Sequence, residues 1–263
     1  NHYHYLAFSE VKNISTMNTP FLSVVIPAYN LSQNPKPGAL NQVDSYLKKQ
    51  KYSWEVILVD DGSSDNTFFQ LQEFARSHNN FIALTIPHGG KVAAIFAGVN
   101  KARGQIVLFT DFDQSTPISE TEKFLPEFEK GHDIVIANRV RVKEKDSLAS
   151  LLRSKIFNLL TQSLVLPGIP DTQCGFKAFK RHVAQELFNR LEVTKPRPIQ
   201  GPYMGAFDVE LLFIARKLGY KIKSVPVTWI REESKNLKFT EPLKMLLEII
   251  KIRLFYLFSS PEK

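Results

Sequence analysis

The segment TDFDQSTP, residues 110–117, places two carboxylates, Asp111 and Asp113, directly after the apolar run 105–109. The run predicts a buried strand, and two like charges held together at its end would normally force one of them to protonate. A divalent cation removes this conflict, because carboxylate oxygens suit Mg²⁺ or Mn²⁺ and substrate phosphates usually complete the coordination. The pair therefore predicts a metal site; a capped turn is the alternative for a D-x-D sequence taken alone.

A second acidic pair, Asp60 and Asp61, lies in the segment VDDGSSDNT, residues 59–67. A strand, a tight turn at Gly62 and a helix cap at residues 63–65 account for most of this segment. They do not account for two adjacent carboxylates at a strand end, where like charges repel. A carboxylate in this place could accept the ring N–H of a nucleotide base or the ribose hydroxyls.

The elements that would position these groups alternate between strand and helix. The expected strands are residues 22–27, 54–60, 81–85, 105–110 and 133–138, and the expected helices are 38–49, 65–77, 91–101 and 119–130. Continuous apolar strands separated by helices indicate an α/β fold with a mostly parallel sheet covered on both faces. Ligands of such sheets bind at the carboxyl ends of the strands, where Tyr29 and Asn30 also fall.

The second half of the chain is less regular. The expected helices are 147–164, 181–191 and 208–218, the expected strand is 221–227, and residues 194–205 form a loop rich in proline and glycine. The last helix, 240–258, carries a narrow polar stripe of Lys244, Glu248 and Lys251 and is otherwise almost wholly apolar. Two interpretations of it stay open: a helix packed on the core, or a helix lying in a membrane interface.

Charge and composition limit the kinds of partner that the protein can have. The net charge of the 263 residues is +8, and ten Lys and Arg against four Glu place +6 of it between residues 216 and 253. A basic end indicates an anionic partner, and because no nucleic-acid recognition motif is present we expect phosphates or a lipid surface, not nucleic acid. No apolar run approaches the roughly 18–20 residues that span a bilayer. The single cysteine, Cys174, excludes an internal disulfide and a cysteine-built zinc site.

Four segments, in order, resemble glycosyltransferase family 2, the inverting enzymes with the GT-A fold. They are VVIPAYN (24–30), VDDGSSDNT (59–67), GGKVAAIFAGVNKARGQIVLFTDFD (89–113) and IANR (136–139). The resemblance implies a GT-A domain over residues 20–238, followed by an amphipathic helix over 239–263. Residues 1–19 would form an N-terminal tail, of upstream or artificial origin before Met17. Within the family, DTQCGFKAFKR (171–181) looks like the polyprenyl- and dolichyl-phosphate sugar synthases, and more like their glucosyl than their mannosyl branch.

The resemblance also implies roles for individual residues. Asp113, Asp171 and Arg139 would take part in catalysis, Arg139 and Arg153 would hold an acceptor phosphate, and Asp111 and Asp113 would hold Mg²⁺ or Mn²⁺. The residues expected to bind the nucleotide-sugar donor are Pro27, Tyr29, Asn30, Asp60, Asp61, Lys91, Asp111, Arg231 and Lys235. The sequence departs from the family pattern at Leu31, His88 and Phe112, where glutamate, asparagine and a small residue are common.

The acceptor decides whether a general base is needed. A lipid phosphate is anionic at neutral pH and needs none, whereas a sugar hydroxyl would need one, for which Asp171, Asp208 and Glu210 are candidates. We therefore expect an inverting, metal-dependent transfer of a hexose, with UDP-glucose the favoured donor, to a polyprenyl phosphate by a cytoplasmic enzyme bound peripherally to the membrane. The alternatives are a GDP-mannose-dependent transferase, a family 2 transferase acting on a saccharide hydroxyl, and an idle nucleotide- or membrane-binding domain.

Overall fold

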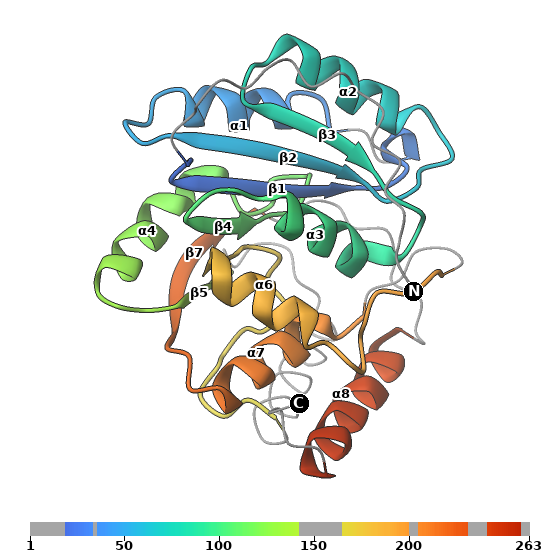
Figure 1. The fold of residues 1–263 in the computed structure, drawn as a ribbon, viewed down its shortest axis with the longest axis vertical. Helices are drawn as coiled ribbons and strands as arrows, with labels where there is room; N and C mark the ends of the chain where they lie inside the picture. Colours follow the sequence, from blue (N-terminus) through green and yellow to red (C-terminus); the bar gives the residue numbers. More distant parts are fainter. Residues whose placement is uncertain (1–18, 34–35, 142–164, 200–204, 231–240, 259–263) are drawn as a thin grey trace.

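The computed structural model describes residues 19–33, 36–141, 165–199, 205–230 and 241–258, and within them one mixed sheet forms the middle layer (Figure 1). Its strands are β1 (Leu22–Ala28), β2 (Trp54–Asp60), β3 (Phe81–Thr85), β4 (Ile106–Phe109), β5 (Ile134–Arg141), β6 (Lys177–Lys180) and β7 (Ile222–Trp229). The helices are α1 (Ala39–Leu47), α2 (Thr67–Ser77), α3 (Gly90–Lys101), α4 (Thr121–Glu129), α6 (Arg181–Asn189), α7 (Phe207–Lys217) and α8 (Glu241–Phe258), with short 3₁₀ turns η1 (Leu31–Gln33) and η2 (Ile118–Glu120).

The strand order is β3-β2-β1-β4-β6-β5-β7, and β6 alone in this described sheet runs antiparallel to its neighbours β4 and β5. The other neighbours pair in parallel, as the continuous apolar runs predicted. The sheet is therefore the mostly parallel α/β sheet expected from the sequence. Strand β6 was not predicted, because its four residues, KAFK, begin and end with a lysine and resemble an exposed loop.

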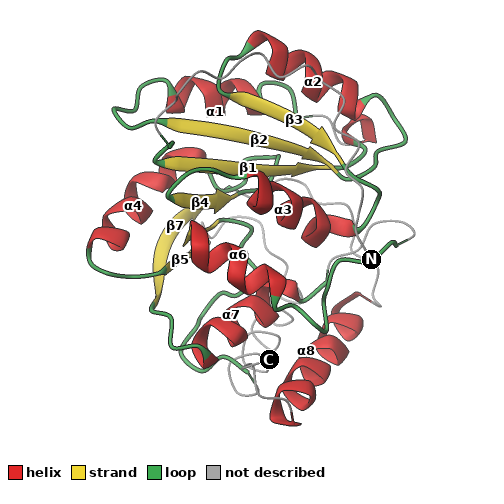
Figure 2. Ribbon diagram, viewed as in Figure 1, coloured by secondary structure: helices red, strands yellow, loops and turns green. Residues whose placement is uncertain are grey.

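Helices cover both faces of the sheet, as Figure 2 shows. Successive side chains of a strand point to opposite faces, so each strand feeds two cores. On one face, Val25 and Ile57 pack with residues of α3, α6 and α7. On the other, Val24 and Val56 pack with residues of α1, α2 and α4. The two cores together hold β1, β2 and β4 in register, which fixes the positions of their carboxyl ends.

Helix α8 presents two different faces. Ile249, Ile252 and Tyr256 are buried in the core that also contains α7, which confirms that one side of the helix packs on the body of the protein. The exposed apolar stripe of α8 consists of Leu247, Ile250, Leu254 and Leu257, whose exposed fractions are 39–54%. No described helix is both long enough and apolar enough to cross a bilayer.

Candidate active site

The predicted acidic pairs lie at one edge of the sheet, at the carboxyl ends of β2 and β4, which flank β1 on its two sides. The antiparallel strand β6 begins at the same edge, because Lys177 at its start lies opposite Phe109 at the end of β4. The segment 171–176 that leads into β6 therefore meets the carboxyl ends of β4 and β5. The topology brings the D-x-D residues and the 171–181 motif together, as a single site requires.

Asp111 is held by a cation from the neighbouring helix. The ammonium of Lys91, in the first turn of α3, donates to Asp111 Oδ1 and forms an ion pair with it. Burial opposes ionisation of Asp111, but the charge of Lys91, with smaller contributions from Lys177 and Arg139, holds the pKa of this carboxyl below its usual value. Asp111 is therefore an ionised carboxylate that is paired with the ammonium of Lys91.

Asp113 lies in a tight turn directly after β4. Its Oδ1 accepts the backbone N–H of Ser115 at 2.9 Å, which is the capped turn considered as the alternative for the D-x-D pair. The next residue, Gln114, has a φ of 53°, in the left-handed region, and its side-chain amide donates to the carbonyl oxygen of Asp111 at 2.9 Å. Among the residues that the structure describes, the turn binds Asp113 through Oδ1 and holds both carboxylates near the end of β4, so the turn and a metal site are compatible.

The donor set suits a hard divalent cation. Asp111 already binds one positive charge, that of Lys91, and only a glycine at position 175 lets its carboxylate keep this place, since a Cβ at Gly175 would lie 2.1 Å from Asp111 Oδ2. No group of three or more His, Cys, Asp or Glu side chains in the described ranges could hold a metal ion. An ion at Asp111 and Asp113 would therefore take the rest of its ligands from phosphate or water.

Arg139 and Asp171 form a bidentate ion pair beside the acidic turn. Arg139 donates from Nε to Asp171 Oδ2 at 2.6 Å and from Nη2 to Oδ1 at 2.9 Å, and its guanidinium lies 5.6 Å from the ring of Trp229. Burial opposes the charges on both groups, but their mutual hydrogen bonds lower the pKa of Asp171 and raise that of Arg139. Asp171 is thus an ionised residue that orients Arg139, and its low pKa suits a positioning role better than that of a general base.

The other two candidate bases are engaged in structural contacts. Asp208 Oδ1 accepts a hydrogen bond of 2.7 Å from Lys177, whose side chain is 1% exposed. Glu210, fully buried, accepts the backbone N–H groups of residues 192–194, the hydroxyl of Thr194 and the hydroxyl of Tyr256. Glu210 therefore holds the chain between α6 and α7 against α8. These contacts do not favour a role for Glu210 as a general base.

Two residues of this site were missed in the sequence analysis, although both belong to the quoted 171–181 motif. Lys177 is a buried cation that also donates to the carbonyl oxygen of Cys174 at 2.5 Å and lies 5.6 Å from the ring of Phe109. Gly175 packs directly against the carboxylate of Asp111. The local sequence shows only that Lys177 lies next to apolar residues and that Gly175 precedes a phenylalanine. Neither feature reveals that Lys177 binds Asp208 or that Gly175 packs on Asp111.

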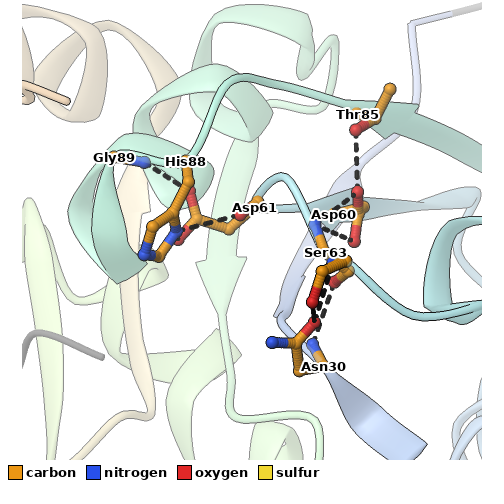
Figure 3. Close-up of polar contacts among 8 residues, drawn as sticks. Asn30, Asp60, Asp61, Ser63, Thr85, His88 and Gly89 are labelled. Atoms are coloured by element: carbon orange, nitrogen blue, oxygen red, sulfur yellow. Dashed lines mark hydrogen bonds and ion pairs between the residues drawn. The ribbon is translucent and has the colours of Figure 1, made fainter. Parts of the chain in front are cut away.

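The second acidic pair is embedded in hydrogen bonds, as Figure 3 shows. Asp60 accepts the hydroxyl of Thr85 at 2.7 Å and the backbone N–H of Ser63 at 3.3 Å. Asp61 accepts the backbone N–H of Gly89 through Oδ1 at 2.9 Å, and its Oδ2 lies 2.9 Å from Nδ1 of His88. Burial raises the pKa of Asp61, and these two partners offset part of the rise. Both carboxylates thus order the loops at this edge, and binding of a base or ribose by either stays a prediction.

The turn after β1 joins the same network. Asn30 has a φ of 47°, and its backbone N–H donates to the hydroxyl oxygen of Ser63 at 2.9 Å (Figure 3). Its Oδ1 accepts the backbone N–H of Ser64 at 2.9 Å. The rings of Tyr29 and His88 stack at a centroid distance of 4.3 Å. His88, which departs from the family pattern, therefore links Tyr29 to Asp61.

Pro27 lies one position before the end of β1. Of the remaining predicted site residues, Arg153, Arg231 and Lys235 lie outside the described ranges.

The fold with this site is that of GT-A glycosyltransferases. Mannosyl-3-phosphoglycerate synthase from Rubrobacter xylanophilus has a TM-score of 0.63 at 18% identity, over 93% of this chain and 78% of that one. Glucosyl-3-phosphoglycerate synthase from Mycobacterium tuberculosis, in a complex with Mn²⁺ and UDP, has a TM-score of 0.60 at 18% identity, over 89% and 80%.

Sequence comparisons narrow this class. The family model of glycosyl transferase family 2 matches residues 23–188. A dolichyl-phosphate beta-glucosyltransferase of Homo sapiens is 35% identical over 263 residues, covering 91% of this chain and 76% of that protein. One of Trichomonas vaginalis is 34% identical over 251 residues, covering 90% and 74%. The chain belongs to glycosyl transferase family 2 and is a glycosyltransferase, as the order of its motifs predicted.

Proposed function

We propose that this protein transfers glucose from UDP-glucose to a polyprenyl phosphate such as dolichyl phosphate, with inversion at the anomeric carbon and with Mg²⁺ or Mn²⁺ as cofactor. The observation that carries the proposal is the pairing, at one sheet edge, of an acidic turn at Asp111 and Asp113 with a bound guanidinium at Arg139. The names of the relatives in humans and Trichomonas vaginalis support the sugar and the acceptor.

The chemistry follows from the charges of the reactants. An oxygen of the acceptor phosphate attacks the anomeric carbon of glucose from the side opposite UDP; the new C–O bond forms as the bond to UDP breaks, and UDP leaves as an anion. No proton has to be removed, because the acceptor is already ionised. Arg139, oriented by Asp171, would hold the acceptor phosphate in line. Asp111 and Asp113 would hold the metal ion, which supplies positive charge that stabilises the departing diphosphate.

The contacts of Asp208 and Glu210 favour a phosphate acceptor over a sugar hydroxyl. Their carboxylates are buried and bound to Lys177 and to the backbone of residues 192–194, respectively. A sugar hydroxyl would require an acid group that is available to take its proton, and Asp171 is already paired with Arg139. The engaged carboxylates therefore favour an acceptor that brings its own negative charge.

Transfer assays test this function directly. The purified chain, incubated with Mn²⁺, radiolabelled UDP-glucose and dolichyl phosphate in detergent, should form an organic-soluble glucolipid. GDP-mannose in place of UDP-glucose, and a simple glucoside in place of the lipid, test the two rival substrates. Labelled mannolipid without glucolipid would show that the donor is GDP-mannose. Labelled disaccharide would show that the acceptor is a sugar hydroxyl, and absence of every product would overturn the proposal.

Substituting Gly175 with alanine should lower the transfer rate by about a hundredfold, because a misplacement of about 1 Å at a reacting centre can have that effect. The new methyl group would lie 2.1 Å from Asp111 Oδ2, so the carboxylate must move. Gly168→Ala is the matched control: Gly168 has a φ of 81° but nothing within 4 Å of an added Cβ, so this variant should lose stability and keep its turnover. Equal turnover in both variants would contradict the role given to Gly175.

The exposed apolar stripe of α8 should bind the surface of a membrane, which would bring a cytoplasmic enzyme to a lipid acceptor. The stripe is accompanied by the exposed cations Lys244, Lys251 and Arg253, as expected of a helix that meets anionic lipid. We expect the protein to float with liposomes that contain phosphatidylserine. The double variant Ile250→Ser with Leu254→Ser should remain in the soluble fraction and keep its turnover on a short, water-soluble prenyl phosphate. Flotation of this variant at the wild-type level would exclude α8 as the contact.

A further inference from the structure

The contact between Lys91 and Asp111 affects how the metal ion and the nucleotide-sugar donor bind together. We propose that Lys91 acts as an internal counter-cation that competes with the metal ion for Asp111 and is released when the diphosphate of the donor binds, so that the metal and the donor bind cooperatively. This inference rests on the proposed function, since it takes the metal and the nucleotide diphosphate as the ligands of the site.

The described part of the site contains more than one cation, and Lys91 is the one placed to exchange. Arg139 donates to both oxygens of Asp171, and Lys177 is 1% exposed and donates to Asp208. Lys91 instead meets Asp111 near the surface, where the side chains of the two residues are 33% and 39% exposed. A partly hydrated ion pair between a flexible lysine and a carboxylate can open at low cost, whereas the buried pair of Lys177 cannot.

A metal ion and Lys91 cannot occupy Asp111 together without strong repulsion. The ammonium group is in hydrogen-bond contact with Oδ1, and a divalent ion bound to the same carboxylate would bring two positive centres within a few ångströms. Binding of the metal alone therefore has to break the ion pair and leave Lys91 without its partner. This lowers the affinity of the free protein for the metal.

The donor removes this obstacle because its diphosphate offers Lys91 a new partner. Lys91 lies in the first turn of α3, and the dipole at a helix N-terminus also attracts phosphate. Once Lys91 has moved from Asp111 to a phosphate, the carboxylate is free for the metal. Each ligand thus raises the affinity for the other, as thermodynamic linkage requires.

Mn²⁺ binding, measured from the electron paramagnetic resonance signal of the free ion, tests the inference without any turnover. For the wild-type protein, saturating UDP should tighten Mn²⁺ binding at least about fivefold. Lys91→Met removes the competing charge, so Mn²⁺ without UDP should bind at least about fivefold tighter than in the wild type, and the further gain with UDP should shrink. Lys91→Arg, which keeps the charge, should behave like the wild type.

Lys101→Met is the matched control, because Lys101 is an exposed lysine in the last turn of the same helix and its loss changes the net charge equally. It should leave both Mn²⁺ constants unchanged. An Mn²⁺ affinity of Lys91→Met equal to or below that of the wild type would overturn the inference, even if the wild type transfers glucose. If the wild type neither binds UDP nor transfers glucose, the proposed function fails, and the Mn²⁺ comparison without UDP still decides whether Lys91 competes at Asp111.

Discussion

Replacing Asp111 with asparagine should lower the rate of glucosyl transfer about a thousandfold, which corresponds to about 4 kcal/mol of lost transition-state stabilisation. The amide keeps the shape of the side chain but removes the charge that would hold the metal ion against the departing diphosphate. Initial rates of glucolipid formation at saturating UDP-glucose and Mn²⁺ provide the measurement. The variant should remain folded, because Asp111 and Lys91 are partly exposed and water can replace their contact.

The control for this variant is Glu129→Gln, which makes the same charge change at an exposed residue at the end of α4. It should transfer glucose at the wild-type rate. If Asp111→Asn kept more than about a tenth of the wild-type rate, the carboxylate would contribute too little to be the metal ligand of the reaction.

Replacing Arg139 with methionine should impair both stability and transfer. The variant leaves Asp171, which is 5% exposed, without its bidentate partner, and breaking a buried ion pair in this way typically costs about 3 kcal/mol or more. Transfer should fall at least about a hundredfold if the guanidinium also positions the acceptor phosphate. Urea unfolding gives the loss of stability, and initial rates at a range of dolichyl phosphate concentrations give the loss of transfer.

A double variant separates the two effects. Arg139→Met combined with Asp171→Asn removes both charges and keeps a side-chain oxygen for one of the two backbone N–H groups, those of Arg139 and Gln173, that the two oxygens of Asp171 accept. It should recover most of the lost stability and remain slow in transfer. Recovery of transfer together with stability would show that Arg139 serves the fold and not the acceptor.

The same pair predicts a dependence of stability on pH. The pKa of Asp171 is lower in the folded protein than in the unfolded chain, so its contribution is complete above the ordinary aspartate value of about 3.9 and is lost as the pH falls through the folded value. Unfolding free energies measured from neutral to acidic pH should therefore decline less steeply for the double variant than for the wild type. Parallel declines would contradict this account of the pair.

The sequence contained enough information for the parallel part of the sheet. Strands β1, β2 and β4 consist mostly of apolar residues, with Ser23 and Glu55 near the starts of β1 and β2, and such nearly continuous apolar runs indicate burial on both faces. Because the carboxyl ends of such strands are the usual place for ligands, the sequence alone predicts that the acidic residues at the ends of β2 and β4 lie in one site.

The partners of these residues could not be predicted in the same way. Lys91 and Asp111 are separated by 20 residues, and Arg139 and Asp171 by 32. The periodicity of a single helix or strand therefore cannot indicate that the members of each pair are in contact. The contact between Arg139 and Asp171 depends on the place of β6 beside β5, and the four residues of β6 carry too little periodicity to reveal a strand. Glu210 illustrates the opposite error: an acidic residue near a helix start resembled a catalytic group, although it is fully buried among backbone donors.

The reversed direction of β6 brings one short peptide, residues 171–176, against both charged pairs of the site, since Asp171 binds Arg139 and Gly175 packs on Asp111. Asp60 and Asp61 are instead held by contacts with Thr85, His88 and Gly89. Under the proposed function, we therefore expect an exchange of this hexapeptide between family members to change the recognition of the acceptor phosphate only if the glycine beside Asp111 is kept.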